Sequence, residues 1–323
     1  MIQSASATSD QRDVIVVTGA DLAAQAVVLL SNFNLVFSGK HYRESDLIAL
    51  GEQYNPVAIL LRYGSVSEAV MAAAPRLKII AKHGTGTDTI DKIAAAKREI
   101  VVVAAPGANA VAVSEHALTL LLACAKSVVQ LNARMASGHW DKATHKSMEL
   151  SGKTIGIIGL GAIGLRMAKL CAALDMTVLG YDPYASQLPS FINQVDLPEI
   201  WRRSQAISLH CPLTPLTKHI INADSLASCR KGLLLINTAR GGLTDEPALL
   251  AAVQAGHVAM AGIDSFAEEP VVPLHLFAGR DGFILSPHIG GVTNEAYINM
   301  GVAAATNILS HFNSAAALKT SPY

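Results

Sequence analysis

The chain has 323 residues, which is more than one hydrophobic core usually serves, so we expect about two domains. Hydrophobic residues make up 51% of it, charged residues 15% and aromatic residues 5%, a balance typical of buried parallel strands covered by helices. The 25 Lys and Arg residues balance the 25 Asp and Glu residues, and no basic run stands out. This charge pattern excludes a protein that binds nucleic acid or an anionic membrane surface mainly by electrostatic attraction.

The cysteines and the N-terminus indicate the cellular compartment in which the protein is expected. The cysteines show no CxxC spacing, so we expect neither disulfides nor a metal site from Cys124, Cys171, Cys211 and Cys229. Residues 1–11 are small and polar without an apolar core, which predicts a disordered lead-in and not a signal peptide. No apolar stretch approaches the roughly 20 residues of a membrane span. We therefore expect a cytoplasmic protein with no membrane partner.

Strand-like and helix-like runs alternate from the start of the chain, which predicts an α/β fold. The first predicted strands are Val14–Val17, Val57–Leu61, Lys78–Ala81 and Ile100–Val103. An amphipathic stretch, Val66–Ala74, predicts a helix between two of them. This first unit ends near Pro106. Ala110–Leu131 then follows as one long helical pattern that is apolar and rich in small residues.

A second α/β unit is predicted from Lys153 onward. Its expected strands are Thr154–Ile158, Thr177–Tyr181, Ala206–Leu209, Gly232–Ile236, Val258–Gly262 and Gly282–Leu285. Six parallel strands are the number of a full dinucleotide-binding sheet. The stretch Asn294–Phe312 predicts a helix that closes the chain.

A glycine-rich turn, Gly159-Leu-Gly161-Ala-Ile-Gly164, follows the first strand of the second unit. Gly159 permits a tight turn, and Gly161 lets the backbone approach a pyrophosphate. Gly164 allows the next helix, predicted at Ala162–Leu174, to pack closely on its strand. The start of that helix offers unpaired N–H groups and a positive dipole end to phosphates. Three glycines at this spacing also occur in ordinary tight turns, but the flanking strand and helix favour a dinucleotide site.

Asp182 closes the next apolar run, Thr177–Tyr181. A carboxylate at this strand end is placed to accept hydrogen bonds from two adenosine ribose hydroxyls and to repel a 2′-phosphate, which favours NAD over NADP. The alternative interpretation is a turn carboxylate that precedes Pro183 and has no ligand.

Four polar side chains follow successive predicted strands of the second unit. Their segments are Asn237-Thr-Ala-Arg240, Gly262-Ile-Asp264 with Glu269-Pro270, and Ser286-Pro-His288. Residues just outside the carboxyl ends of an open parallel sheet converge where a nicotinamide lies. Taken singly, Arg240 could be a surface salt-bridge partner, Glu269 a solvated acid and His288 a loop histidine without a task. Together, at successive strand ends, they favour a catalytic site.

These segments resemble the D-isomer-specific 2-hydroxyacid dehydrogenase family, and the resemblance covers nearly the whole chain after Arg12. It is also carried by Gly84-Thr-Gly-Thr-Asp88, Asn109-Ala-Val-Ala-Val-Ser114-Glu-His-Ala-Leu and His210-Cys-Pro-Leu-Thr-Pro-Leu-Thr217. The resemblance implies a Rossmann cofactor domain, residues 109–294, inserted into a flavodoxin-like substrate domain formed by residues 12–108 and 295–323. It further implies NAD as the cofactor and a small 2-hydroxy or 2-oxo acid as the substrate.

The same resemblance makes His288 the acid/base, Glu269 its hydrogen-bonded partner, and Arg240 the group that holds and polarises the substrate. In the reducing direction a hydride passes to the carbonyl carbon of a 2-oxo acid, and a protonated imidazole can quench the charge that grows on the oxygen. A carboxylate on the other ring nitrogen favours that protonated form. The arginine fork binds both oxygens of a carboxylate.

The resemblance also implies which residues surround the cofactor. Asp264 would accept a hydrogen bond from the nicotinamide carboxamide, while Thr238 and Ala239 would line the ring. Further cofactor contacts are implied at Ala162, Ile163, His210, Cys211, Pro212, Thr217, Arg240, His288 and Gly290.

On the substrate side, the backbone of Gly84, Thr85 and Gly86 would receive the substrate carboxylate, although this loop is alternatively a simple turn. Arg62 and Tyr63 end the preceding strand and are candidates for substrate selectivity, followed by Lys82 and His83. His116 lies on an apolar helical stretch, which is more typical of a core or interface histidine than of a catalyst.

Ala110–Leu131 resembles the dimer-forming region of the family, so we expect a two-fold homodimer. Because the sequence stops at Tyr323, we expect no appended regulatory domain. Two other functions stay open. One is a different chemistry on the same scaffold, such as formate or phosphite oxidation, against which Glu269 counts because formate-oxidising relatives have Gln there. The other is a non-enzymatic, NAD(H)-responsive module like the corepressors that share this fold.

Overall fold

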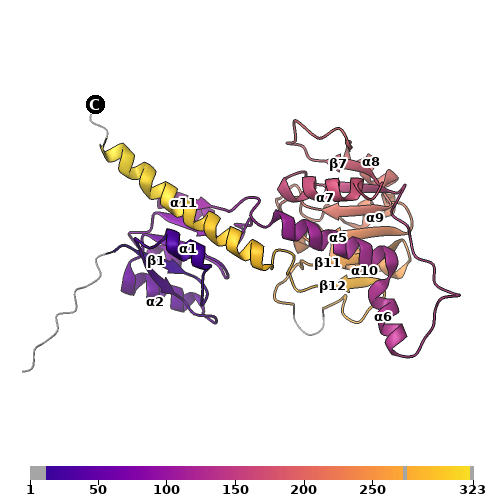
Figure 1. Cartoon of the computed structure of the whole chain (residues 1–323), viewed down its shortest axis with the longest axis horizontal. Helices are drawn as coiled ribbons and strands as arrows, with labels where there is room; N and C mark the ends of the chain where they lie inside the picture. The colour runs from indigo at the N-terminus through magenta and orange to yellow at the C-terminus, as the bar shows by residue number, and fades with distance from the viewer. Residues whose placement is uncertain (1–11, 272–274, 321–323) are drawn as a thin grey trace, which may run out of the picture. The chain divides into compact units, whose positions relative to one another are not determined.

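The computed structural model describes residues 12–271 and 275–320, with side chains described up to residue 314, so the predicted lead-in at 1–11 lies outside the described part. The chain divides into two compact units (Figure 1). Unit 1 comprises Met1–Asn109 and Thr293–Tyr323, and unit 2 comprises Ala110–Val292. Each unit is built on its own parallel sheet with helices on both faces, which confirms the predicted fold class.

Unit 1 has a five-stranded sheet of order β2-β1-β3-β4-β5, the order of flavodoxin-like folds. Its strands are β1 (Val14–Val17), β2 (Asn34–Phe37), β3 (Ala58–Leu61), β4 (Ile79–Lys82) and β5 (Val101–Val103). Its helices are α1 (Ala24–Leu29), α2 (Glu44–Tyr54), α3 (Glu68–Ala72), α4 (Lys92–Lys97) and α11 (Asn294–Thr320). Alternating side chains pack on opposite faces: Ile15 contacts the side covered by α1 and α11, and Val16 the side covered by α2 and α3.

Unit 2 has a seven-stranded sheet of order β12-β11-β10-β9-β6-β7-β8. Its strands are β6 (Thr154–Ile158), β7 (Thr177–Tyr181), β8 (Ile192–Gln194), β9 (Ala206–Leu209), β10 (Leu233–Asn237), β11 (Val258–Ile263) and β12 (Phe283–Leu285). Its helices are α5 (Ala110–Lys126), α6 (Val128–Ala136), α7 (Ala162–Ala172), α8 (Leu197–Arg203), α9 (Ala223–Ser228) and α10 (Glu246–Gln254), with a 3₁₀ turn η1 (Gly241–Leu243). Apart from the extra strand β12, this is the dinucleotide-binding order.

Local sequence signals explain where these elements begin. β10 is a run of five buried residues, as a central parallel strand requires. α10 is capped by Asp245, which precedes it and whose side chain accepts a hydrogen bond from the Ala248 amide, and Pro247 occupies the first turn of the helix. α8 begins in the same way at Asp196, followed by Pro198. Because the central strands pair in parallel, their carboxyl ends lie at one edge of the sheet.

Two expectations about the elements are wrong. The prediction missed β2 in unit 1 and β8 in unit 2, so the sheets have five and seven strands instead of four and six. The long helix expected over Ala110–Leu131 is instead two helices, α5 and α6, bent by 59°. The break lies at Ser127, which has a left-handed φ of 52° that a continuous helix excludes.

The helices of the described residues were compared with the length and apolarity that a membrane span needs. Within residues 12–271 and 275–320, each helix taken alone is too short or too polar to cross a bilayer, and only the bent pair α5 and α6 passes when the two are joined. All four cysteines carry buried free thiols.

Candidate active site

The glycine turn between β6 and α7 is shaped by close backbone packing. Gly159 has a φ of 91°, and a Cβ there would lie 2.5 Å from the Cys211 nitrogen. A Cβ on Gly164 would collide with the Gly159 carbonyl oxygen. At Gly161, in contrast, a Cβ would meet nothing within 4 Å. The turn therefore leaves open space in front of the N-terminus of α7, which begins at Ala162 and fits a diphosphate.

Asp182 lies just beyond β7 and ties the glycine turn to the end of that strand. Its Oδ2 atom accepts a hydrogen bond from the Leu160 amide at 2.8 Å, and its Oδ1 atom accepts one from the Tyr184 amide at 2.9 Å. Each carboxylate oxygen has a second lone pair, so both can still accept from ribose hydroxyls. The carboxylate thus has a structural task, and its contact with the ribose stays a prediction.

The segment after β9 packs against the glycine turn. Burial lowers the pKa of His210 to about 4, so its ring is neutral, and its Nε2 atom lies 2.8 Å from the Ser208 hydroxyl. Burial raises the pKa of the Cys211 thiol to about 11. The Thr217 hydroxyl donates to the Pro212 carbonyl at 2.7 Å and accepts from the Thr214 amide at 2.8 Å. These side chains hold the loop in shape beside the turn.

The end of β10 carries the Arg240 segment, and Asn237 shapes it. The buried Asn237 side chain accepts from the Ala239 amide at 3.0 Å and donates to the Arg240 carbonyl at 2.9 Å. The Arg240 guanidinium donates to the Ala239 carbonyl at 2.7 Å. Sequence reasoning did not identify Asn237 as a functional residue, because an amide at the last position of a strand occurs in many sheets.

Thr238, next to Asn237, has a hydroxyl that is buried and lacks a hydrogen-bond partner among the described residues. An unpaired buried hydroxyl costs about 1–3 kcal/mol, so such a group is normally paired with something. Together with the open space at Gly161, this orphaned hydroxyl fits a site that is completed by a dinucleotide.

His288 and Glu269 form a close pair between the ends of β12 and β11. The His288 Nδ1 atom lies 2.6 Å from Oε2 of Glu269, and both side chains are partly exposed, at 44% and 34%. The other carboxylate oxygen of Glu269 accepts from the Phe266 amide at 2.9 Å. Burial raises the pKa of Glu269, but these hydrogen bonds and the charges of His288 and Arg240 outweigh it and bring that pKa below its usual range. Nε2 of His288 is then the nitrogen left for proton transfer.

Asp264, at the end of β11, anchors the segment that carries His288. Its carboxylate is 1% exposed and accepts hydrogen bonds from the Ser286 hydroxyl at 2.6 Å and from the amides of Ile289 and Gly290 at 3.0 and 2.8 Å. Burial raises the pKa of Asp264, yet hydrogen bonds lower it to about 2. The predicted contact with a carboxamide would come in addition to this anchoring task.

His116 belongs to the same network. Its Nε2 atom lies 2.9 Å from the Ser286 hydroxyl, which in turn donates to Asp264. The structure therefore places His116 in contact with the residues that hold the His288 segment. Its position on an apolar helix face gave no sign of this, because the partners come from the distant ends of β11 and β12.

In unit 1, Arg62 at the end of β3 is enclosed. Its side chain is 7% exposed, pairs with Asp21, and lies 5.2 Å from the ring of Tyr63 and 5.0 Å from that of Tyr297. Tyr297 also donates to Asp21 at 3.1 Å. Sequence reasoning selected Arg62 and Tyr63 but missed Asp21 and Tyr297, which reach the arginine from distant parts of the chain.

The glycine loop of unit 1 follows β4. Gly84 has a φ of 145°, and its carbonyl accepts from the Ala105 amide at 2.8 Å. The preceding residue, His83, lies 3.1 Å through Nε2 from the Tyr297 carbonyl, and burial lowers its pKa to about 4. His83 is therefore a neutral, structural histidine that supports the loop containing Thr85.

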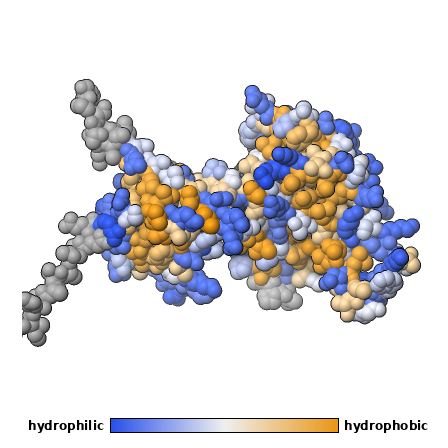
Figure 2. All heavy atoms as spheres, in the orientation of Figure 1, coloured by the Kyte–Doolittle hydropathy of each residue, from blue (hydrophilic) through white to orange (hydrophobic). Residues whose placement is uncertain are grey.

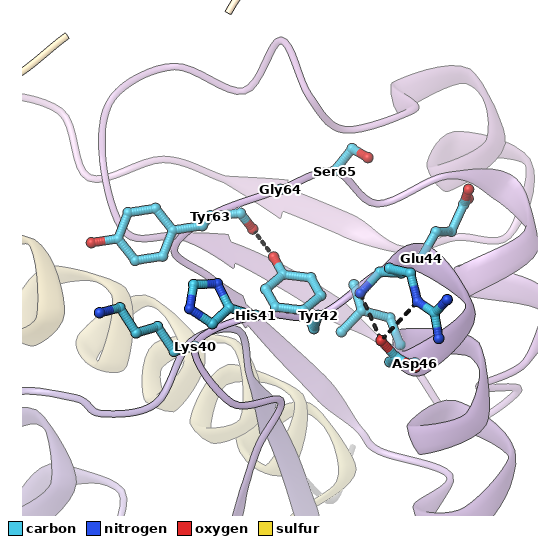
Figure 3. A pocket seen from close by; sticks show the side chains of 10 residues that line it. Lys40, His41, Tyr42, Glu44, Asp46, Tyr63, Gly64 and Ser65 are labelled. Carbon is cyan, nitrogen blue, oxygen red and sulfur yellow. Dashed lines mark hydrogen bonds and ion pairs between the residues drawn. The ribbon is translucent and has the colours of Figure 1, made fainter. Parts of the chain in front are cut away.

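Tyr63 also lies on a cavity of about 680 Å³ in unit 1 (Figure 3). The other lining residues are Lys40, His41, Tyr42, Arg43, Glu44, Asp46, Leu47, Gly64 and Ser65. Figure 3 shows the Tyr63 ring on the same side of the pocket as Lys40 and His41, while the Tyr42 hydroxyl is bonded to the Tyr63 carbonyl. This contact fixes the backbone from which the Tyr63 side chain extends.

Comparison with known proteins identifies the family to which the chain belongs. The family described as "D-isomer specific 2-hydroxyacid dehydrogenase, NAD binding domain" matches residues 118–290. The chain is 39% identical over 257 residues to D-3-phosphoglycerate dehydrogenase of Archaeoglobus fulgidus, which covers 78% of this chain but 49% of that protein. The chain thus spans about half the length of this relative.

Two further proteins match over nearly their whole length. Hydroxypyruvate reductase of Thermotoga maritima is 36% identical over 283 residues, with 87% of this chain and 92% of that protein covered. The crystal structure of the TT0316 protein from Thermus thermophilus superposes with a TM-score of 0.85 at 30% identity, covering 93% of this chain and 97% of that one. The chain therefore belongs to the D-isomer specific 2-hydroxyacid dehydrogenase family of NAD-dependent oxidoreductases.

Proposed function

We propose that this protein interconverts a D-2-hydroxy acid and its 2-oxo acid with NAD(H). The observation that carries the proposal is the 2.6 Å hydrogen bond between His288 and Glu269, with Arg240 close enough for its charge to lower the pKa of Glu269. A base, an acid and a cation at the ends of neighbouring parallel strands supply the groups that carbonyl reduction needs.

Each of the three side chains has a task in this proposal. Arg240 binds the substrate carboxylate and polarises the carbonyl. His288, protonated on both nitrogens, donates from Nε2 to the oxygen as negative charge grows there, and in the oxidising direction it takes that proton back. Glu269 stabilises the charged ring through Nδ1 and keeps it in one orientation. NAD(H), when bound, supplies or accepts the hydride.

We propose that unit 2 holds NAD in preference to NADP. The diphosphate would lie in the open space at Gly161, near Ala162, Ile163 and Gly164. Asp182 would accept from the ribose hydroxyls and repel a 2′-phosphate. The remaining contacts would come from the loop His210–Thr217, from Thr238 and Ala239, and from Asp264 and Gly290.

We propose that residues 12–108 and 295–323, which lie within unit 1, act as the substrate domain, and that residues 109–294, which include all of unit 2, act as the cofactor domain. In the substrate domain, the backbone of Gly84, Thr85 and Gly86 would receive the substrate carboxylate. Arg62 and Tyr63 would select the substrate's R group, and the cavity beside Tyr63 is our candidate for the pocket that accommodates it.

We also propose a two-fold homodimer formed through α5 and α6. Every residue of α6 is at least partly exposed, and apolar side chains in α6 and just after it are open to solvent: Val128, Val129, Met135 and Trp140, at 53%, 51%, 58% and 73%. Val111, near the start of α5, is 47% exposed. Figure 2 shows apolar atoms gathered on the face where α5 lies. Monomers rarely expose apolar side chains in groups of this kind.

A steady-state screen of NADH oxidation tests the proposed activity. The purified protein would be offered pyruvate, glyoxylate, hydroxypyruvate, 3-phosphohydroxypyruvate, sulfopyruvate and oxaloacetate, with NADPH as the cofactor control. Turnover of one 2-oxo acid well above the others would support the proposal and name the substrate class. NADH binding without turnover of any of them would contradict it and favour a corepressor-like module or a different chemistry.

A further inference from the structure

A second carboxylate–histidine pair lies behind the first one in unit 2. Glu246 and His275 are 3.2 Å apart, between Oε2 and Nε2, and their side chains are 10% and 11% exposed. Neither residue belongs to the groups assigned to the cofactor or the substrate above. A buried carboxylate costs several kcal/mol unless hydrogen bonds compensate for the lost water, so its position requires an explanation.

The Glu246 carboxylate is bound to the loop that carries Glu269. Glu246 is the first residue of α10, and its Oε1 atom accepts a hydrogen bond from the Ala267 amide at 2.9 Å. The adjacent amide, that of Phe266, donates to Oε1 of Glu269 at 2.9 Å. Two consecutive backbone N–H groups thus connect the two carboxylates. An acid at a helix start that served only the helix dipole could remain in solvent.

His275 contacts the second carboxylate oxygen of Glu246, and its own hydrogen bonds define which ring nitrogen carries the proton. The Phe277 amide donates to Nδ1 of His275 at 3.2 Å, so the ring proton is on Nε2 and points at Glu246. The ring packs edge-on against Phe266 and Phe277, with centroids 5.0 and 4.8 Å away. Phe266 therefore meets the second pair through its ring and the first pair through its amide.

Gly241 packs against the backbone of the same loop at Phe266 and Ala267. A Cβ on Gly241 would overlap the carbonyl group of Phe266 and the nitrogen of Ala267. Because glycine has no Cβ, the Phe266–Ala267 backbone can lie directly against Gly241, the residue that follows Arg240. The loop is therefore fixed from two sides, by Gly241 and by Glu246.

We propose that Glu246 and His275 are positioning residues, which fix the Phe266–Ala267 backbone so that Glu269 stays bonded to Nδ1 of His288. The inference rests on the proposed function of that pair. Among the described residues, the charge of Arg240 acts on Glu269, and Asp264, which lies 3.4 Å from the titratable His116, binds the amides that follow His288. Without the second pair, Glu269 would move relative to its partner and stabilise the protonated ring less well.

The variants His275→Phe and Glu246→Gln test this. Phenylalanine keeps the ring packing but removes both nitrogens, and glutamine places an NH₂ group against the Nε2 proton of His275. We expect kcat for 2-oxo acid reduction to fall about 10-fold and the alkaline limb of its pH profile to move to lower pH by about half a unit or more. The dissociation constant of NADH should stay within about twofold.

Two further variants serve as controls. His275→Gln places an amide N–H near the original Nε2 position and should restore most of the rate and the wild-type profile. Glu199→Gln changes a first-turn acid of α8 that is bonded to Arg202 and Arg203. This variant should change neither the rate nor the pH profile.

The second readout does not depend on turnover. NMR titration of imidazole-labelled protein with NADH bound should show the His288 ring losing its proton at lower pH in His275→Phe than in the wild type. A lower melting temperature with an unchanged pH profile and unchanged titration would overturn the positioning role. Absence of wild-type turnover would instead contradict the proposed function, and the titration would still decide whether the second pair acts on the first.

Discussion

The Asp264 carboxylate accepts a hydrogen bond from the Gly290 amide at 2.8 Å and thereby joins the end of β11 to the segment after β12. That segment contains His288, whose φ of 53° is left-handed and unfavourable for a residue with a side chain. The Ile289 amide donates to the same carboxylate at 3.0 Å. A buried acid therefore holds the proposed acid/base in a conformation that it would otherwise rarely adopt.

Asp264→Asn should destabilise the protein at neutral pH, because its NH₂ group would face one of the donors that the carboxylate now accepts. The folded-state pKa of Asp264 is lowered from 3.8 to about 2. A depressed pKa means that the carboxylate contributes stability above pH 4, about 2 kcal/mol, and loses it as the pH falls from about 4 to about 2. Urea unfolding of both proteins across this range measures the difference.

The control for this experiment is Asp281→Asn, which changes an exposed turn aspartate of the same unit and should leave the free energy of unfolding unchanged. Equal stability of Asp264→Asn and the wild type at pH 7 would contradict the anchoring role.

Thr238→Val should weaken NADH binding without destabilising the unliganded protein. The Thr238 hydroxyl is buried with no partner among the described residues, so removing it costs the folded chain nothing. If the cofactor satisfies this hydroxyl, the dissociation constant of NADH should rise by about 5- to 30-fold, or about 1–2 kcal/mol. Fluorescence titration with NADH and thermal unfolding without it measure the two quantities.

Thr217→Val is the control, because it removes a hydroxyl that has hydrogen-bond partners within the protein. The Thr217 hydroxyl bonds both the Pro212 carbonyl and the Thr214 amide, so its loss should lower the free energy of unfolding by about 1 kcal/mol. A Thr238→Val protein that binds NADH as tightly as the wild type would show that the hydroxyl has no part in the cofactor site.

Replacing Asp182 should change cofactor selectivity. In the double variant Asp182→Ser, Tyr184→Arg, the repelling carboxylate is lost and a cation is added at a site where the native side chain is 86% exposed. We expect the ratio of kcat/KM for NADPH to that for NADH to rise at least 10-fold. Because Asp182 also accepts from the Leu160 amide, the single variant should weaken binding of both cofactors. An unchanged ratio would place the selectivity elsewhere.

The sequence was sufficient for the fold class and for the central strands, because these are buried runs with clear boundaries. The two missed strands, β2 and β8, lie at sheet edges and are short, and β8 has only one buried residue, Ile192. Such strands are paired on one side only. β8 (Ile-Asn-Gln) has no continuous apolar pattern, and none of the four residues of β2 is fully buried. The bend at Ser127 was missed because apolar periodicity continues on both sides of it.

Some residues of the candidate site could likewise be selected from the sequence and others could not. Arg240, Glu269 and His288 could be selected because they follow strands that the sequence defines, and the structure brings the last two together. Glu246 and Asn237 could not be selected, because a first-turn acid and a strand-end amide occur in many helices and strands. Their roles depend on backbone groups of the loops after β10 and β11, and hydrogen bonds to backbone groups leave no pattern in the sequence.

The proposed dimer predicts a mass in solution of twice 33.9 kDa. Met135→Asp, in α6, should convert it to the monomer because it places a charge on the apolar face proposed to meet the second copy. Light scattering measures the mass. Ile93→Asp is the matched control, since Ile93 is 72% exposed but belongs to α4 of unit 1. A monomeric wild-type protein would rule out this interface.

The most direct test of the account is the His288→Ala variant, measured with the best substrate of the screen. If His288 is the acid/base, kcat for NADH oxidation should fall by about 100-fold or more, since general acid catalysis contributes at least that factor. The dissociation constant of NADH, measured by fluorescence, should stay within about twofold of the wild-type value. A kcat close to that of the wild type, or a loss of NADH binding in place of turnover, would contradict the assignment of His288 as the proton donor.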